Sequence, residues 1–289
     1  MTALAGLEEL FEDLAAGRCT VEAARKRHGL LCRGLAGREV RFDWDRPSRK
    51  GIGEVVYSPG KEFGHLEGIR DEALRRRANV AFSRLEGEVA RRLGGTIPEW
   101  SYEPRSRLGT LVCVPPETRG RVAVVAAGTT DIPAAEEAAG IAGFSGCGVD
   151  RFYDVGVSGI HRLFEVLPSL READVAVVAA GMEGALPSVV AGLVPGLVIG
   201  LPTSVGYGIA EGGRTALRAM LASCCPGLVV VNIDNGVGAG LSAALVARGR
   251  GCEGATGPSG HPTPGSFGCG GRTSEDPETG GIRGPFPPG

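Results

Sequence analysis

The hydrophobic positions follow one pattern between residues 119 and 246. Short runs rich in valine, alanine and isoleucine alternate there with alanine-rich segments of helical length. The runs are continuous rather than alternating, which is typical of strands covered on both faces. Strands separated by helices favour a parallel sheet with right-handed crossovers, so we predict a three-layer α/β sandwich. The expected strands lie in GRVAVVAAG, VDRFYDVG, ADVAVVAAG, GLVIGLP and GLVVVNI, and the expected helices in IPAAEEAAGIAGF, GIHRLFEVLPSL, ALPSVVAGL and GGRTALRAMLAS.

The flanking regions differ from this pattern. The first 115 residues are charged and rich in arginine, with strands expected in EVVY and RLGTLVCVPP and helices near 6–16, 20–28 and 67–92. Residues 251–289 are about half glycine and proline without periodicity, which is typical of a disordered tail. The expected organisation is an α+β domain over 1–116, the α/β domain over 117–250 and a tail over 251–289.

Composition narrows the class of protein. The formal net charge is −2, so basic residues are balanced and neither a nucleic acid nor an anionic membrane is expected as partner. The eight cysteines form no C-x-x-C pair and no zinc-type cluster, which indicates free thiols in a reducing cytoplasm and no metal site. The N-terminus lacks the apolar core of a signal peptide. The apolar stretch 185–202 is interrupted by three prolines, so we expect a helix and a buried strand there rather than a membrane span.

Candidate chemistry follows the strands, because open parallel sheets bind ligands beyond the carboxyl ends of their strands. After the first strand come Thr129, Thr130 and Asp131, which suit a ribose or a phosphate at a helix N-terminus. Plain helix capping is the alternative for these residues. The loop is not G-x-G-x-x-G, so no Rossmann dinucleotide fingerprint is present.

The later strands also end in polar loops. After the second strand, His161 and Arg162 open a helix, where arginine pairs with phosphate and histidine moves protons; ordinary surface positions are the alternative. After the third, Glu183 lies in a glycine-rich turn and serves either as a base or as a helix cap. After the fourth comes a long loop with Tyr207. After the fifth, Asn232, Asp234 and Asn235 form a polar cluster that suits a ligand, a subunit contact or a plain turn.

Six of these segments, taken in order, resemble the LarB family of nickel-pincer cofactor biosynthesis proteins. They are AGTTDIPAAEEA, YDVGVSGIHR, AGMEGALPSVVAGL, PTSVGYG, SCCPG and NIDNGVGAG. The resemblance runs from about residue 4 to 246 and implies a flavodoxin-like C-terminal domain similar to AIR carboxylase. The AIR carboxylase likeness is looser: its S-D loop matches Thr130-Asp131, and its S-A-H-R matches Ser158 to Arg162 with one extra residue. The family's N-terminal D-x-x-R-x-x-R-x-G run gives Asp43, Arg46, Arg49 and Gly51, with Glu54 following.

The resemblance implies a reaction on nicotinic acid adenine dinucleotide. Its pyridinium ring would be carboxylated with carbon dioxide or bicarbonate, and its phosphoanhydride hydrolysed to give AMP and pyridinium-3,5-biscarboxylic acid mononucleotide. Later steps would complete the nickel-pincer nucleotide used in lactate racemase maturation. No organic cofactor is expected. A magnesium ion would suit the phosphoanhydride, because a divalent cation neutralises phosphate charge.

The family's pattern also implies roles for residues. Cys224 would be the thiol that adds to the ring, and Glu183 the base that removes the ring proton. Cys225 departs from the family, which commonly has alanine there, and we expect it only to pack. Because Cys224 follows a helix C-terminus, where the dipole disfavours a thiolate, we expect an ordinary thiol in the free enzyme. We expect the strand order to place Cys224 at the same edge as Glu183 and Asp131. The expected substrate-binding residues are Thr129, Thr130, Asp131, Asp154, Ser158, His161, Arg162 and Tyr207.

Two other functions stay open at this point. One is an AIR carboxylase of purine biosynthesis, which would need neither the arginine-rich first hundred residues nor a cysteine at 224. The other is a non-catalytic nucleotide-binding homologue. Related folds form closely packed assemblies, so the resemblance also implies a homo-oligomer, an octamer being one such assembly.

Overall fold

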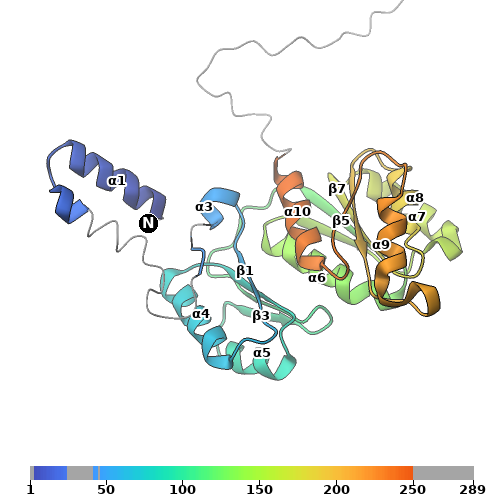
Figure 1. The fold of residues 1–289 in the computed structure, drawn as a ribbon, viewed down its shortest axis with the longest axis horizontal. Helices are drawn as coiled ribbons and strands as arrows, with labels where there is room; N and C mark the ends of the chain where they lie inside the picture. Colours follow the sequence, from blue (N-terminus) through green and yellow to red (C-terminus); the bar gives the residue numbers. More distant parts are fainter. Residues whose placement is uncertain (1–2, 25–41, 45, 250–289) are drawn as a thin grey trace, which may run out of the picture. The chain divides into compact units, whose positions relative to one another are not determined.

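The computed structural model describes residues 3–24, 42–44 and 46–249 (Figure 1). The predicted tail over 251–289 lies outside these residues, as does the second half of the helix expected near 20–28. The helix expected near 6–16 is confirmed as α1 (Ala3–Ala15). No helix in the described ranges has both the length and the apolar character needed to cross a membrane.

The predicted parallel sheet is confirmed. Its strands are β5 (Arg121–Ala126), β6 (Gly148–Phe152), β7 (Val175–Ala180), β8 (Leu197–Pro202) and β9 (Leu228–Val230). They pair in the order β6-β5-β7-β8-β9, and every pairing is parallel. This is the doubly wound order of flavodoxin-like folds, in which the second strand lies outside the first.

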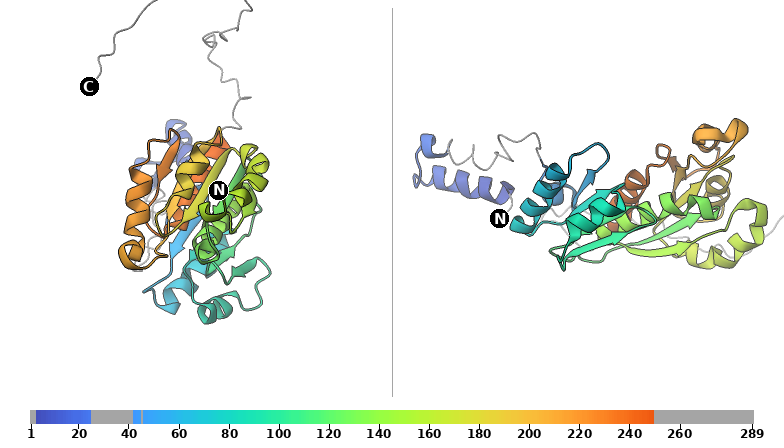
Figure 2. Two further views of the ribbon diagram at one scale, coloured as in Figure 1. Left: turned by 90° about the vertical axis from the view of Figure 1, so that its right-hand side faces the viewer. Right: turned by 90° about the horizontal axis from the view of Figure 1, so that it is seen from below.

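Helices cover both faces of the parallel sheet, as the further views in Figure 2 show. The covering helices are α6 (Ile132–Phe144) and α10 (Gly236–Gly249) on one face, and α7 (Ile160–Arg171), α8 (Leu186–Ala191) and α9 (Arg214–Leu221) on the other. In β5, Val122 and Val124 pack toward α6 and α10, whereas Ala123 and Val125 pack toward the opposite helices. Burial on both sides explains why these strands read as continuous apolar runs. The helix and strand expected in 185–202 are α8 and β8.

The last helix, α10, was not among the predicted elements. Its first turns contain Gly236, Gly238 and Gly240, which is more typical of a loop than of a helix. The structure gives two of these glycines a packing role. A Cβ at Gly236 would lie 2.7 Å from the Ala134 carbonyl oxygen, and one at Gly240 would lie 2.5 Å from that of Ala138. Glycine therefore lets α10 lie directly against the backbone of α6.

The N-terminal part is a smaller mixed sheet. Its strands are β1 (Glu54–Tyr57), β2 (Val80–Ser83), β3 (Trp100–Glu103) and β4 (Leu108–Leu111), in the order β1-β2-β4-β3. The first pair is parallel and the others are antiparallel. The two strands expected from EVVY and RLGTLVCVPP are confirmed as β1 and β4. The boundary predicted at 116 falls in the connection between β4 and β5.

The single helix expected near 67–92 is wrong. The chain forms α4 (Phe63–Arg76), then β2, then α5 (Gly87–Gly94). Arg77 takes a left-handed conformation, with φ of 53°, and ends α4. All four residues of β2 are buried, and tertiary packing of this short apolar run overrides the helical pattern around it.

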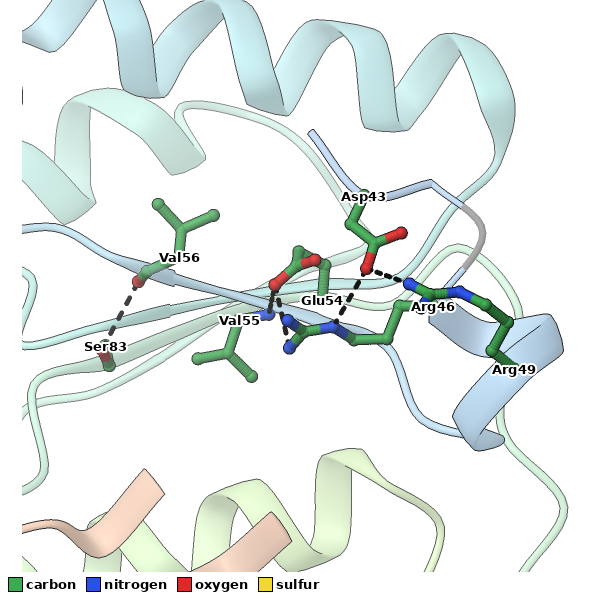
Figure 3. Close-up of polar contacts among 7 residues, drawn as sticks. All are labelled: Asp43, Arg46, Arg49, Glu54, Val55, Val56 and Ser83. Carbon is green, nitrogen blue, oxygen red and sulfur yellow. Dashed lines mark hydrogen bonds and ion pairs between the residues drawn. The ribbon is translucent and has the colours of Figure 1, made fainter. Parts of the chain in front are cut away.

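The mixed sheet lies between two layers of helix. Val56 and Phe82 face the core formed with α4 and α5. Val55 and Ala81 point the other way, toward α6 and α10, where Ile141 is buried with them. Figure 3 shows Val55 and Val56 on opposite sides of β1. One face of this sheet therefore packs directly on helices of the parallel sheet.

Candidate functional site

Asp131 joins two loops at the carboxyl edge of the parallel sheet. It ends η1 (Thr129–Asp131), directly after β5, and is only 4% exposed. Its carboxylate accepts hydrogen bonds from the Gly128 N–H at 2.9 Å and the Thr203 hydroxyl at 2.6 Å. Burial raises the pKa of Asp131, and these hydrogen bonds oppose the rise. Thr129 and Thr130 stay exposed beside this contact.

The loop after β6 presents an ion pair at the same edge. Asp154 has a left-handed backbone, with φ of 59°, and its carboxylate lies 2.6 Å from Nη1 of Arg162. Gly156 approaches the end of β5 so closely that a Cβ there would lie 2.7 Å from the Ala127 carbonyl oxygen. Ser158, in η2 (Val157–Gly159), and His161 are exposed. The loop therefore places a hydroxyl, an imidazole and a guanidinium next to β5.

Glu183 follows β7 in a turn that holds its side chain in solvent. Met182 before it and Gly184 after it are both left-handed, with φ of 52° and 65°. The Met182 N–H donates to the Val205 carbonyl at 2.8 Å, which ties the turn to the loop after β8. That loop also carries the exposed Tyr207, just before η3 (Gly208–Gly213). A carboxylate and an aromatic ring thus lie on connected loops.

Cys224 does not share this edge, and the expectation that it does is wrong. It lies between α9 and β9, and residues that precede a parallel strand lie toward its amino end. The start of α9 touches the Glu183 turn, since a Cβ at Gly184 would lie 2.8 Å from the Ala216 Cα. From Ala216 the helix advances about 1.5 Å per residue, so Leu221 is about 8 Å further along and Cys224 is beyond it. Within one chain, Cys224 and Glu183 lie at opposite ends of α9.

The two adjacent cysteines have different surroundings. Cys224 is exposed, whereas Cys225 is half-buried and packs against the core beneath α7, α8 and α9. The Cys225 N–H donates to the Ser223 hydroxyl at 3.3 Å, and that hydroxyl lies 2.8 Å from the hydroxyl of Ser188 in α8. The predicted packing of Cys225 is confirmed.

The N-terminal run of charged residues forms an ion-pair network with itself (Figure 3). Arg46 Nη1 lies 2.9 Å from a Glu54 carboxylate oxygen, and Arg46 Nε lies 3.7 Å from Asp43. Arg49 also pairs with Asp43. Burial raises the pKa of Glu54 and the Arg46 charge opposes the rise. The network holds the short helix α3 (Arg46–Lys50) against the first residue of β1.

One arginine links the mixed sheet to the loop after β9, and sequence reasoning missed it. Arg84 follows β2, and its Nη2 donates to the Asp234 carbonyl at 2.5 Å. Asp234 in turn accepts a hydrogen bond from the Ser204 N–H at 2.9 Å through its carboxylate. Arg84 Nε lies 3.9 Å from the buried carboxylate of Glu137 in α6. Arg84 and Asp234 are 150 positions apart, so no local pattern could have indicated the contact.

Thr203 is a further residue of this edge that was not predicted. It directly follows the buried strand β8, which is the one signal that could have identified it. Across residues 3–24, 42–44 and 46–249, no group of three histidine, cysteine or acidic side chains could hold a metal ion.

Two family matches cover parts of the chain, one over the mixed sheet and one over the parallel sheet. Residues 36–112 match a family described as a LarB/PurE-like N-terminal domain, and residues 121–250 match AIR carboxylase. An uncharacterized protein of Methanocaldococcus jannaschii, MJ0165, is 39% identical over 220 residues. The match covers 72% of this chain and 84% of that protein, so the likeness includes both sheets.

Proposed function

We propose a reaction for this chain from its family, since it belongs to the LarB/PurE family, whose N-terminal and AIR carboxylase domains it joins. The chain is thus a carboxylase-type enzyme. Its proposed substrate is nicotinic acid adenine dinucleotide. It carboxylates the pyridinium ring with carbon dioxide or bicarbonate and hydrolyses the phosphoanhydride. The products are AMP and pyridinium-3,5-biscarboxylic acid mononucleotide, and the reaction is the first step of nickel-pincer nucleotide biosynthesis.

The observation that carries this proposal is the group of loops at the carboxyl edge. Arg162 supplies a cation for a phosphate, with the hydroxyl of Ser158 and the imidazole of His161 on the same loop. Thr129 and Thr130 add exposed hydroxyls on the neighbouring loop for ribose or phosphate oxygens. Glu183 supplies an exposed carboxylate one strand further on. In a substrate with two phosphates and a reactive ring, the phosphates would meet the cation and the hydroxyls, and the ring would meet the carboxylate.

The ring chemistry requires a nucleophile and a base. A thiolate forms a C–S bond with the ring carbon next to the one to be carboxylated. A π electron pair of the ring moves onto the cationic nitrogen, and the ring becomes a neutral dihydropyridine. The enamine carbon then attacks carbon dioxide and forms the new C–C bond. A base removes the ring proton at that carbon, the C–S bond breaks and aromaticity returns. This is covalent catalysis, in which one difficult step becomes several easier ones. We assign the thiol to Cys224 and the base to Glu183.

This assignment requires two copies of the chain. The thiol and the base act on adjacent carbons of one ring, whereas Cys224 and Glu183 of one chain lie at opposite ends of α9. At the C-terminal end of α9 the chain exposes a face with Cys224 and Leu221, the latter 66% exposed. We place a second copy on this face, so that its Glu183 loop meets Cys224 in a homo-oligomer; an octamer agrees with the resemblance.

In this proposal a magnesium ion would be bound by the substrate rather than by the protein. A divalent ion carried on the phosphoanhydride neutralises phosphate charge during hydrolysis, and the chain needs no organic cofactor. Chelation of magnesium is then expected to slow AMP release more than carboxylation.

Incubation of the protein with nicotinic acid adenine dinucleotide and labelled bicarbonate tests the function. Label in a pyridinium product together with AMP release supports it. Label in an aminoimidazole nucleotide, when that substrate is supplied instead, would identify an AIR carboxylase. Nucleotide binding without label in either assay would identify a non-catalytic homologue.

Mixing two inactive variants tests the shared site. Cys224→Ala and Glu183→Gln chains, each inactive alone, should regain part of the activity when dissociated and reassembled together. A mixed assembly that stays inactive would contradict a site shared between copies.

A further inference from the structure

Tyr57, the last residue of β1, is an exposed aromatic ring on a face that is otherwise packed. Side chains alternate along a strand, so Tyr57 points to the same side as Val55, toward α6 and α10. Val55 and Ala81 on this side are in contact with those helices. Tyr57 is nevertheless 54% exposed. The ring therefore stands at the margin of the packed face with an open surface.

Arg84 holds this ring in place. Its guanidinium lies over the Tyr57 ring, 5.9 Å from the ring centroid. The same guanidinium also contacts the Asp234 carbonyl at 2.5 Å and the Glu137 carboxylate at 3.9 Å. Glu137 is itself buried and accepts hydrogen bonds from the Gly236 and Val237 N–H groups at the start of α10. Tyr57 is thus backed by a cation that both sheets anchor.

A continuous series of contacts connects Tyr57 to the candidate site. Asp234, which binds Arg84, accepts from the Ser204 N–H, and the residue before Ser204 is Thr203. Thr203 donates to Asp131 at the centre of the carboxyl edge. These contacts join the Arg84 guanidinium, which lies over the Tyr57 ring, to the loops after β8 and β9.

We propose that Tyr57 is the platform on which the adenine base of the nucleotide stacks, with Arg84 as its positioning residue. The inference rests on the proposed function, because it assigns a place to the AMP half of that substrate. Every nucleic-acid base has a planar π face, so adenine can stack on an exposed aromatic ring. Adenine is neutral, whereas the pyridinium ring is cationic and is repelled by the guanidinium beneath Tyr57. The charge of Arg84 therefore assigns the platform to adenine and leaves the pyridinium to the Glu183 loop.

Equilibrium binding of AMP to the full-length chain tests the platform. Tyr57→Phe keeps the aromatic face and should bind AMP like the parent, whereas Tyr57→Leu should bind at least about fivefold more weakly, the lower range for loss of one stacked base. Ribose 5-phosphate, which lacks the base, should bind equally to all three proteins. Phe11→Leu is a matched control, since Phe11 is a 64% exposed aromatic in α1.

Three results would overturn the inference. They are unchanged AMP affinity in Tyr57→Leu, an equal loss of AMP and ribose 5-phosphate binding, and no AMP binding by the parent chain. Failure of the proposed function is seen separately. If the chain does not carboxylate the dinucleotide but AMP binding depends on the Tyr57 ring, the reaction is wrong and the platform stands. If carboxylation occurs and Tyr57→Leu binds AMP normally, only the platform is wrong.

Discussion

The Thr203 hydroxyl donates a 2.6 Å hydrogen bond to the buried carboxylate of Asp131, and this contact joins the loops that follow β8 and β5. Both residues are almost fully buried, so no water replaces the bond if one partner is lost. The position of the exposed hydroxyls at Thr129 and Thr130 depends on it, because they belong to the same turn as Asp131.

Thr203→Val tests this contact. Valine keeps the shape and removes the donor, so the buried carboxylate loses a partner. Loss of one partner of a buried hydrogen bond costs about 1–3 kcal/mol of unfolding free energy. Urea unfolding measures the change. Thr203→Ser keeps the hydroxyl and should lose less, so equal losses in the two variants would show that the hydrogen bond is not the cause.

The raised pKa of Asp131 predicts a pH dependence of stability. Burial raises this pKa above its ordinary value of 3.8, so the folded protein holds the proton more tightly than the unfolded chain. The stabilisation from protonated Asp131 is complete below pH 3.8 and is lost as pH rises through the folded pKa. Asp131→Asn does not titrate. The unfolding free energy of the parent minus that of Asp131→Asn should therefore fall over this window and stay constant above it; a difference that rises with pH would contradict the prediction.

Arg84 and Glu137 should be energetically coupled. Arg84→Met removes the cation that faces the buried Glu137 carboxylate, whose Oε1 has no hydrogen-bond partner in the described structure. We expect a loss of about 1–3 kcal/mol, because a buried polar group is left without its partner. In the double variant with Glu137→Gln the two losses should not add, and a double-mutant cycle measures the difference. Additive losses would show that the pair does not interact.

The ion pair of Arg46 with Glu54 should stabilise the protein only while Glu54 is ionised. Burial raises the pKa of Glu54 and Arg46 opposes the rise, so Arg46→Met raises that pKa further. This partly buried pair contributes on the order of 1 kcal/mol at neutral pH. This contribution should disappear as pH falls below the folded pKa of Glu54, where the carboxylate is protonated in both proteins. Arg49→Met, which removes a partner of Asp43 and has a smaller effect on the pKa of Glu54 than Arg46 has, is the matched control in the same unfolding series.

Replacement of Cys224 should affect the reaction, whereas replacement of Cys225 should affect the unfolding free energy. Cys224→Ala removes the proposed nucleophile from an exposed position and should abolish label uptake with little change in the unfolding free energy. Cys225→Ala should keep the reaction and lose about 1 kcal/mol, because it removes a half-buried side chain from the core. Equal loss of label uptake in both variants would show that Cys224 has no special role.

Parts of this fold that depend on local pattern could be predicted from the sequence. The runs around Val124 and Val177 identify buried parallel strands, because both of their faces are covered. The glycines of α10 misled the prediction, since their value lies in contact with α6 rather than in any helical preference. β2 was hidden because its three apolar residues and one serine lie between two arginine-rich segments that favour helix.

The candidate site was predictable as far as strand order alone determines it. Asp131, Arg162 and Glu183 each follow a strand and lie at the carboxyl edge, as expected from sheet geometry. Cys224 was assigned to the wrong edge because a residue after a helix and before a strand belongs to the amino side. Tyr57 and Arg84 could not be recognised, because their importance depends on Asp234, which lies far along the chain.

The close packing of α10 against α6 has a consequence for how the chain is made on the ribosome. Domains generally begin to fold from the N-terminus while synthesis continues. The apolar face of the mixed sheet, however, also packs against Val237 and Leu241 of α10. Arg84 likewise has no Asp234 carbonyl to donate to until that residue is synthesised. The last strand of the mixed sheet is therefore synthesised about 130 residues before Leu241, the last residue that packs on this face. A nascent chain that pauses before Gly236 leaves this sheet face covered by α6 alone, and it leaves the Glu137 carboxylate without the Gly236 and Val237 N–H groups.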